Sequence, residues 1–117
     1  MKSSSGNPSA VRVTRNWTAT YHDPISIRRG EPVTLTGRED MWHGHRWLWA
    51  VARDGREGWV PDSLIDGDRA RQDYSAMELT CRAGDRLVTG ASNHGWTWCT
   101  NPEGREGWVP DECLTPD

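Results

Sequence analysis

The sequence contains no apolar run long enough to be a signal peptide or a membrane span. The first nine residues, MKSSSGNPS, are polar and rich in glycine, serine and proline. Such a segment buries too little apolar surface to offset the entropy lost on ordering. We therefore expect residues 1–10 to form a disordered tail, and we expect a cytoplasmic location.

An excess of positive charge is also lacking. The 117 residues include 14 Lys and Arg against 17 Asp and Glu, and Lys2 is the only lysine. Residues 1–66 carry nine basic and eight acidic residues (+1), and residues 67–117 carry five and nine (−4). A protein that binds a phosphate backbone needs a basic face. The sequence therefore predicts neither a nucleic-acid partner nor a membrane partner.

Residues that could hold a metal or catalyse a reaction are few. His43 and His45 have no cysteine or carboxylate at the spacing of a zinc site, which needs four protein ligands. His94 is near Cys99 in the sequence, but no third residue is placed to orient the pair. We therefore expect a non-enzymatic protein with no cofactor and no metal.

The chain contains three cysteines, and an odd number cannot pair completely. Cys81, Cys99 and Cys113 all lie in the second half of the sequence. In a reducing compartment unpaired thiols of this kind are ordinary, which agrees with a cytoplasmic setting. We expect Cys81 and Cys99 to act as small core residues. Cys113 has no neighbour in sequence that would lower its pKa, and we favour a structural role for it as well.

What the chain does contain is an internal repeat. The octapeptide Gly-Arg-Glu-Gly-Trp-Val-Pro-Asp spans residues 55–62 and occurs again, unchanged, at residues 104–111. The offset is 104 − 55 = 49 residues, and the same offset relates Trp47 and Trp49 to Trp96 and Trp98. Self-similarity at one offset indicates a duplicated unit. Each copy has about 50 residues, close to the smallest size at which one core is stable.

The apolar residues follow the two-residue period of strands. Val11 and Val13 alternate with polar residues, as do Val33 and Leu35, whereas no segment shows a helical period over three turns. Asp54-Gly55 is a strong hairpin signal between two apolar runs. Many short strands separated by Gly and Pro predict an all-β protein with two small barrels in tandem. We place them at residues 11–65 and 69–115, joined by a linker short enough to fix their relative orientation.

The landmarks of each copy resemble those of the Src-homology-3 (SH3) domain, in its bacterial variant form. In order they are (Asp/Asn)-aromatic-x-Ala, Leu-x-apolar-x-x-Gly-(Asp/Glu), Trp-x-x-Ala, and Gly-x-x-Gly-aromatic-Val-Pro. The resemblance implies five-stranded, strongly bent barrels with an aromatic groove between long loops. It also implies a role in binding extended proline-rich or basic segments.

The resemblance further implies which residues form the groove of each copy. Both copies keep the central tryptophan, the proline and one further aromatic residue, but two ring positions have been lost in each. Proline-rich helices dock between parallel rings, so we expect weakened binding of that ligand class. The positions are Arg15, Trp17, Trp47, Pro61 and Leu64 in the first copy, and Gln72, Tyr74, Trp96, Pro110 and Cys113 in the second.

Strand alternation predicts a second aromatic surface in each copy, on the face opposite the small aliphatic residues. These rings could stiffen the barrel by cross-strand packing, or be buried between barrels or between copies of the chain. Alternatively they form a platform with a carboxylate at its edge, suited to an arginine, a lysine or an extended peptide. The predicted members are Trp47, Trp49, Glu57 and Trp59 in the first copy, and Trp96, Trp98, Glu106 and Trp108 in the second.

Three functions are compatible with these features. The first is an adaptor that binds a partner protein or peptide through the aromatic surfaces. The second is a structural module whose tryptophan faces are buried in an assembly. The third is binding of a wall polymer, which the lack of an export signal disfavours.

The alternation also predicts the two cores. Thr89 occupies the position of Leu35, so we expect the second barrel to have a hydroxyl in a core slot and to be the less stable. The predicted core residues are Val33, Leu35, Leu48, Ala50 and Val60 in the first copy, and Leu79, Leu87, Cys99 and Val109 in the second.

Overall fold

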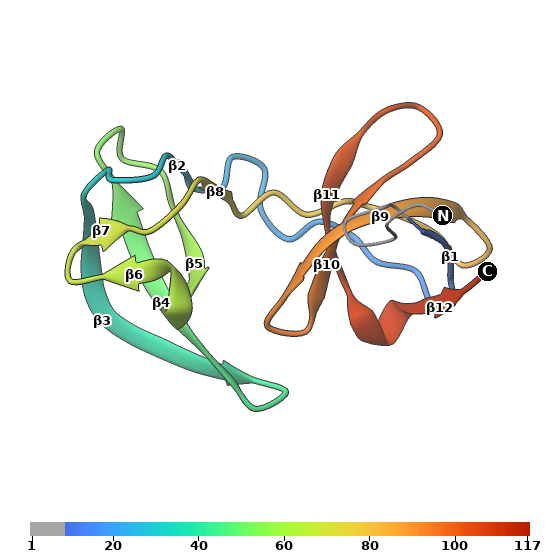
Figure 1. The fold of residues 1–117 in the computed structure, drawn as a ribbon, viewed down its shortest axis with the longest axis horizontal. Coiled ribbons are helices and arrows are strands. Elements are labelled where there is room, and N and C mark those ends of the chain that lie inside the picture. Colours follow the sequence, from blue (N-terminus) through green and yellow to red (C-terminus); the bar gives the residue numbers. More distant parts are fainter. Residues whose placement is uncertain (1–8) are drawn as a thin grey trace, which may run out of the picture. The chain divides into compact units, whose positions relative to one another are not determined.

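The computed structural model describes residues 9–117, and most of the expected disordered tail lies outside this range. The described part is all β except for two single-turn 3₁₀ helices, η1 (Asp62–Leu64) and η2 (Asp111–Cys113) (Figure 1). No helix formed by these residues is long and apolar enough to cross a membrane. The predicted all-β class is confirmed. Ala10, the last residue of the expected tail, belongs to a strand.

Twelve strands are found among residues 9–117. The two long hairpins turn at His43-Gly44 and His94-Gly95, where all four residues have positive φ, the geometry of a tight two-residue hairpin. The strands are β1 (Ala10–Val13), β2 (Ser26–Ile27), β3 (Val33–Trp42), β4 (His45–Ala52), β5 (Glu57–Pro61), β6 (Ile65–Asp66), β7 (Arg69–Ala70), β8 (Tyr74–Ser75), β9 (Arg86–Asn93), β10 (Trp96–Thr100), β11 (Glu106–Pro110) and β12 (Leu114–Pro116).

The compact units do not follow the sequence repeats. The continuous unit is Tyr21–Met77, and the discontinuous unit joins the chain up to Thr20 to Glu78–Asp117. The barrels expected at residues 11–65 and 69–115 differ from these units by the exchange of one segment. The first segment of the first copy, up to Thr20, lies in the discontinuous unit with the rest of the second copy. The first segment of the second copy, from Arg69 to Met77, lies in the continuous unit with the rest of the first copy.

Strand pairing in the discontinuous unit shows this exchange directly. Its five-stranded sheet has the order β11-β10-β9-β1-β12, so β1 from the start of the chain lies between two strands of the second copy (Figure 1). Arg12 pairs with Arg86 on β9 and with Thr115 on β12. Further along, Trp17 forms an antiparallel bridge with Cys81.

The continuous unit receives the corresponding segment of the second copy. Strands β3, β4 and β5 form a three-stranded sheet. Strand β7 pairs with β6, with Ala70 opposite Ile65, and β8 pairs with β2, with Tyr74 opposite Ile27. In each unit the incoming segment therefore takes the place that the unit's own first segment would fill in a contiguous barrel.

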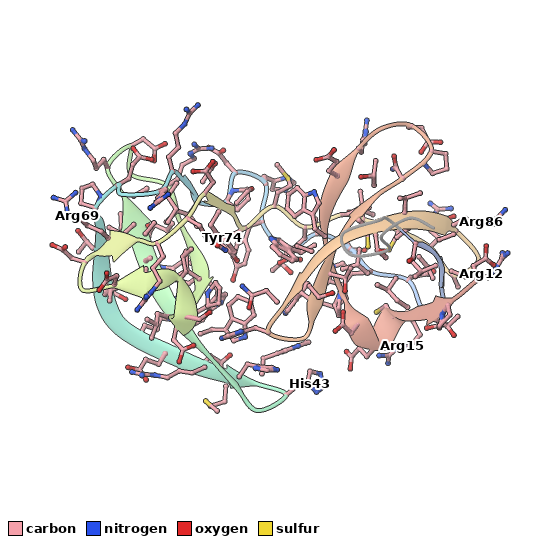
Figure 2. All side chains as sticks on the ribbon, in the orientation of Figure 1. Arg12, Arg15, His43, Arg69, Tyr74 and Arg86 are labelled. Atoms are coloured by element: carbon pink, nitrogen blue, oxygen red, sulfur yellow. The ribbon has the colours of Figure 1, made fainter. Side chains whose placement is uncertain are left out.

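A carboxylate near the C-terminus ties the exchanged strand to its neighbours. Asp117 accepts hydrogen bonds from Arg12 on β1 at 2.9 Å and from Arg86 on β9 at 2.6 Å (Figure 2). These bonds, that of Arg12 first, hold the pKa of Asp117 below its ordinary value. Three adjacent strands are thus linked by one group.

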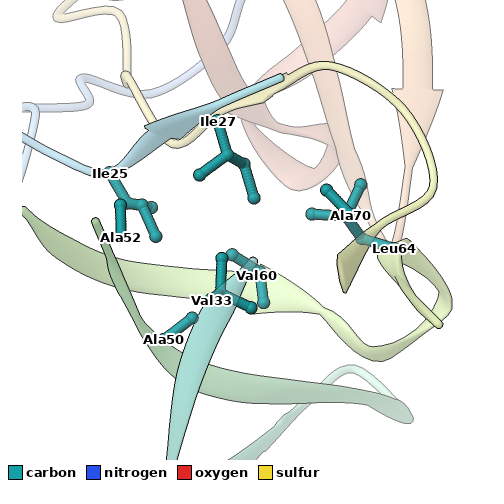
Figure 3. Packing of buried hydrophobic residues seen from close by; sticks show 8 residues of the cluster. All are labelled: Ile25, Ile27, Val33, Ala50, Ala52, Val60, Leu64 and Ala70. Atoms are coloured by element: carbon teal, nitrogen blue, oxygen red, sulfur yellow. The ribbon is translucent and has the colours of Figure 1, made fainter. Parts of the chain in front are cut away.

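Each unit has its own core, and each core includes a residue from the exchanged segment. Ala70 lies in the core of the continuous unit (Figure 3), and Val13 lies in the other core. The continuous unit buries Ile25, Ile27, Val33, Ala50, Ala52, Val60, Leu64 and Ala70. The discontinuous unit buries Val13, Leu79, Cys81, Leu87, Cys99, Val109 and Cys113.

Most of the predicted core residues are buried, and two are not. Leu35 is 38% exposed because β3 bulges directly after it, and Leu48 is only partly buried. Thr89, at the equivalent of Leu35, is partly buried, and its hydroxyl donates to the Ser9 carbonyl at 3.1 Å. The prediction that Thr89 places a hydroxyl in a core slot is therefore wrong, because the residue is only partly buried and its hydroxyl is hydrogen-bonded.

The second glycine of the repeated octapeptide is required by a close backbone crossing. A Cβ at Gly107 would lie 2.6 Å from the backbone nitrogen of Leu79, whereas one at Gly58 would lie 2.9 Å from a side-chain methyl of Ile25. We expect Gly107→Ala to destabilise the discontinuous unit by about 3 kcal/mol or more, and Gly58→Ala to cost about 1–3 kcal/mol, because a side-chain methyl can shift more easily than the backbone at Leu79. Urea unfolding of the two variants checks the order. Equal losses would contradict it.

Candidate aromatic binding surfaces

The exchange brings together groove residues that the sequence resemblance assigned to different copies. In the discontinuous unit the rings of Trp17 and Trp96 meet edge to face, with centroids 5.4 Å apart and an interplanar angle of 80°. The indole N–H of Trp17 donates to Glu78 at 3.1 Å. Glu78 also accepts from the backbone N–H and the hydroxyl of Thr20. The Glu78 carboxylate thus holds both the Trp17 ring and Thr20, the last residue before the chain enters the continuous unit.

The remaining groove positions of the discontinuous unit are Arg15, Pro110 and Cys113. Pro110 pairs with Trp96 across β10 and β11. Arg15 forms an ion pair with Glu112 at 3.2 Å. Cys113 is buried, and desolvation raises its pKa while the nearby Arg15 opposes that rise. The side chain of Cys113 therefore belongs to the core and offers no surface to a ligand.

The continuous unit combines Trp47 and Pro61 of the first copy with Tyr74 of the second. Trp47 and Pro61 pair across β4 and β5. Tyr74 packs against the core, and its hydroxyl donates to the Trp59 carbonyl at 3.3 Å (Figure 2). Trp47 is only 9% exposed, so its ring is nearly closed to solvent. At this position the structure agrees with packing and not with an open platform.

A second aromatic cluster lies on the outer face of β4 and β5. The rings of Trp49 and Trp59 stand opposite each other with centroids 5.0 Å apart, at 81°. The Trp49 indole N–H donates to Glu57 at 2.7 Å. The guanidinium of Arg38 lies 4.7 Å from the Trp49 ring centroid and 5.1 Å from that of Trp59. We call Trp49 and Trp59, together with Glu57, the occupied tryptophan pair, because Arg38 of the same chain lies over both rings.

The discontinuous unit has the same arrangement on β10 and β11. The centroids of Trp98 and Trp108 are 5.2 Å apart, at 82°. The Trp98 indole N–H donates to Glu106 at 3.2 Å. Both tryptophans are half-buried and Glu106 is exposed. We call Trp98, Trp108 and Glu106 the second tryptophan pair.

Two residues of these surfaces were missed in the sequence. Arg38 lies in an apparently polar loop, and only knowledge of the β3 bulge places it over the tryptophans. Tyr21, in the loop between β1 and β2, contacts the Trp49 ring, and the two ring centroids are 5.9 Å apart. Glu78, the acceptor for the Trp17 indole, was missed as well. Among residues 9–117 no group of three or more His, Cys, Asp or Glu could hold a metal ion.

Comparison with known proteins decides the family. The model of the variant SH3 domain matches residues 10–66 and again residues 68–117. The chain belongs to the variant SH3 domain family. Members of this kind are generally peptide-binding adaptor modules, typically non-catalytic, and they generally bind proline-rich partners.

A related protein is the SH3 domain-containing protein Dlish of Drosophila melanogaster, which is 37% identical over 56% of this chain. The match covers 19% of Dlish, so the chain spans about a fifth of that relative's length. Dlish is an animal protein, and the bacterial form of SH3 expected from the sequence is not supported. No solved structure matches the chain. The family matches follow the sequence repeats, whereas the compact units exchange one segment between them.

Proposed function

We propose that this chain is a non-enzymatic adaptor that binds extended segments of partner proteins through aromatic surfaces on both SH3 units. The observation that carries the proposal is the composite groove of the discontinuous unit, where Trp17 and Trp96 meet beside Pro110. The tryptophan of the family's groove is therefore kept and is joined by a ring from the other copy, whereas the side chain of Pro110 is fully buried and offers no surface of its own. Half-buried rings with a carboxylate in reach suit basic extended segments.

Binding of generic proline-rich peptides is expected to be weak in both units. The two positions that hold rings elsewhere in the family are Arg15 and Cys113 in the discontinuous unit, and Gln72 and Leu64 in the continuous unit. Cys113 and Leu64 are each only 2% exposed. Losing a stacking contact costs roughly 1 kcal/mol or more, and each 1.4 kcal/mol is tenfold in affinity. The expected dissociation constant is therefore about millimolar.

Titration of the isotope-labelled chain tests the proposal. Two peptides of equal length are compared, one with a PxxP core flanked by arginine and one extended, basic and free of proline. We expect the basic peptide to bind at least as tightly as the proline-rich one. Trp96→Ala should abolish shifts in the composite groove, and the matched variant Trp98→Ala should leave them in place. If neither peptide binds, the adaptor function is refuted. Micromolar binding of the PxxP peptide would refute the expected weak binding of proline-rich segments.

We further propose that the chain works in a reducing compartment such as the cytoplasm. Cys81, Cys99 and Cys113 are all free and buried in one core. Desolvation raises the pKa of Cys81 to about 11 and that of Cys99 to about 12, which keeps both as thiols. Localisation of a fluorescently tagged chain checks this, and secretion of the tagged chain would contradict it.

A further inference from the structure

The discontinuous unit contains a hollow of about 430 Å³, lined by residues of β1, β9, β10 and β12 and by the start of η2. All of its lining belongs to this one unit. Val11 and Leu114, both half-buried, give it apolar walls. Thr97 is the most deeply buried polar residue of the lining, at 7% exposed. A hollow of this size admits a small ligand in place of water.

Three polar side chains of the lining form a chain of hydrogen bonds. The Thr97 hydroxyl donates to Oδ1 of Asp111 at 2.6 Å, and the hydroxyl oxygens of Thr97 and Ser92 are 3.0 Å apart. A hydroxyl has one proton, and Thr97 gives its own to Asp111, so Ser92 is the donor in the second bond. Ser92 then keeps lone pairs but no proton, and an ionised carboxylate can only accept. The chain therefore presents hydrogen-bond acceptors to the hollow.

The lining also carries negative charge with no positive charge beside it. Asp111 is exposed, and no group among residues 9–117 donates to its second side-chain oxygen, Oδ2. Within the same described range, no lysine or arginine lines the hollow. A ligand that fits needs a cation with donors at one end and an apolar stem for Val11 and Leu114.

A primary ammonium group on an alkyl chain meets both requirements. It is a compact charge with three donors, and its stem is flexible and apolar. A guanidinium is less suitable, because its planar fork binds a carboxylate best through both oxygens at once. Thr97 already uses one of the two oxygens of Asp111.

The continuous unit lacks this chain of hydrogen bonds. The 49-residue offset of the repeat places Leu48 at the position of Thr97, and Leu48 packs against the core of its unit. Ser92 stands opposite Thr97 on β9, whereas the residue opposite Leu48 on β3 is Glu39. Glu39 forms an ion pair with Arg46 at 2.7 Å. The same place in the fold is therefore built differently in the two units.

We infer that the hollow of the discontinuous unit binds a primary alkylammonium group, with the ammonium at Ser92 and Asp111 and the alkyl chain against Val11 and Leu114. Such a group ends a lysine side chain and is also found in free alkylamines. The site goes beyond the proposed adaptor surfaces, because no aromatic residue lines it. Since β1 contributes to the lining, a bound ligand also stabilises this exchanged strand in its place.

Amide spectra of the full chain test the inference with n-pentylammonium chloride and with Nα-acetyl-lysine methylamide as probes. We expect saturable shifts of Ser92, Thr97 and Asp111 at about millimolar concentrations, with Leu48 and Asp62 unchanged. A response to either probe supports the site, and the tighter of the two shows whether it favours a free amine or a lysine side chain. Sodium chloride at the same concentration is the control for ionic strength.

Probes of the same length without the charge show whether the ammonium is what is recognised. n-Pentanol and Nα-acetyl-norleucine methylamide should bind about tenfold more weakly than their ammonium counterparts. The arginine derivative should also bind more weakly than the lysine derivative. Equal binding of the uncharged probes, equal shifts in the continuous unit, or no shift with either ammonium probe would overturn the inference.

Variants of the lining complete the test. Asp111→Asn keeps the size of the side chain and removes its charge, and it should weaken binding about tenfold. Asp62→Asn, at the equivalent position of the repeated octapeptide, is the matched control and should leave binding unchanged. Thr97→Leu places in the hollow the residue that the continuous unit has there and should abolish binding. If that variant does not fold, Asp111→Asn still decides, because its position is exposed. A folded Asp111→Asn chain that binds n-pentylammonium as tightly as the original would refute the site.

Discussion

Cleavage of the folded chain at Gly67 is expected to leave its two halves bound to each other. The cut falls in the turn between β6 and β7, where Gly67 is exposed and has φ +68°. The half before the cut supplies β1 to the discontinuous unit, and the half after it supplies β7 and β8 to the continuous unit. Each half is therefore part of both folded units, and separation would require both units to open.

The measurement is size-exclusion chromatography of a chain that carries a protease site at Gly67, before and after cleavage. We expect one species at the original volume without denaturant and two in urea. Barrels closed in sequence order would instead give two independent halves. As a control, cleavage at both Thr20–Tyr21 and Met77–Glu78 cuts the two crossings between the units and should release the continuous unit. If the doubly cut chain still elutes as one species, the exchange is not what holds the halves together.

The repeat, the hairpin at Asp54-Gly55 with its counterpart at Gly104, and the tryptophan pairs could be predicted because they depend on local pattern, whereas the hairpin at His43-Gly44 was not predicted. The identical octapeptides begin in the hairpin turn before β5 and β11, form these two strands, and end at the first residue of the 3₁₀ helix that follows each. Alternation places Trp49 and Trp59 on one face. The exchange could not be predicted in this way. Residues 16–19 (Asn-Trp-Thr-Ala) and 73–76 (Asp-Tyr-Ser-Ala) are chemically alike, so either segment fits either unit.

The lengths of two loops in the sequence give the physical reason for the exchange. Five residues separate Ala19 from Ile25, but only Met77 and Glu78 separate Ala76 from Leu79. For the second copy to close on itself, these two residues would have to form a two-residue hairpin turn, whose favoured forms need positive φ. Neither side chain suits that conformation. In the exchanged structure the chain passes from one unit to the next at this point and needs no such turn.

Arg38 shows a different limit. Its sequence neighbours, Gly37 and Glu39, give no apolar pattern from which to judge which way it points. Its place over the tryptophans depends on a bulge that adds two residues to β3 against β4, and a bulge of this kind changes which side chains share a face. The occupied tryptophan pair was therefore predictable as a pair of rings and not as a site with its ligand in place.

Replacement of Trp17 is expected to destabilise the discontinuous unit, which holds most of the second copy, and to leave the continuous unit unchanged. Trp17→Ala removes the edge-to-face contact with Trp96 and the hydrogen bond to Glu78. For a half-buried indole the cost is about 2–3 kcal/mol, below the 3–5 kcal/mol of fully buried rings. We expect faster amide exchange in β9 to β11 and a shifted Trp96 indole resonance, with β3 to β5 unchanged.

Tyr74→Ala is the matched variant and should give the opposite pattern. Tyr74 packs on the core of the continuous unit and donates to the Trp59 carbonyl, so β3 to β5 should lose protection while Trp96 keeps its resonance. Tyr74→Phe keeps the ring, removes the hydroxyl with its bond to the Trp59 carbonyl, and should cost about 1 kcal/mol. Barrels closed in sequence order would reverse both patterns, with Trp17→Ala felt at Trp47 and Tyr74→Ala felt at Trp96. Because Trp17 and Trp96 form one groove, Trp17→Ala and Trp96→Ala should each abolish the same peptide-induced shifts. The variant with both replacements should then lose nothing further.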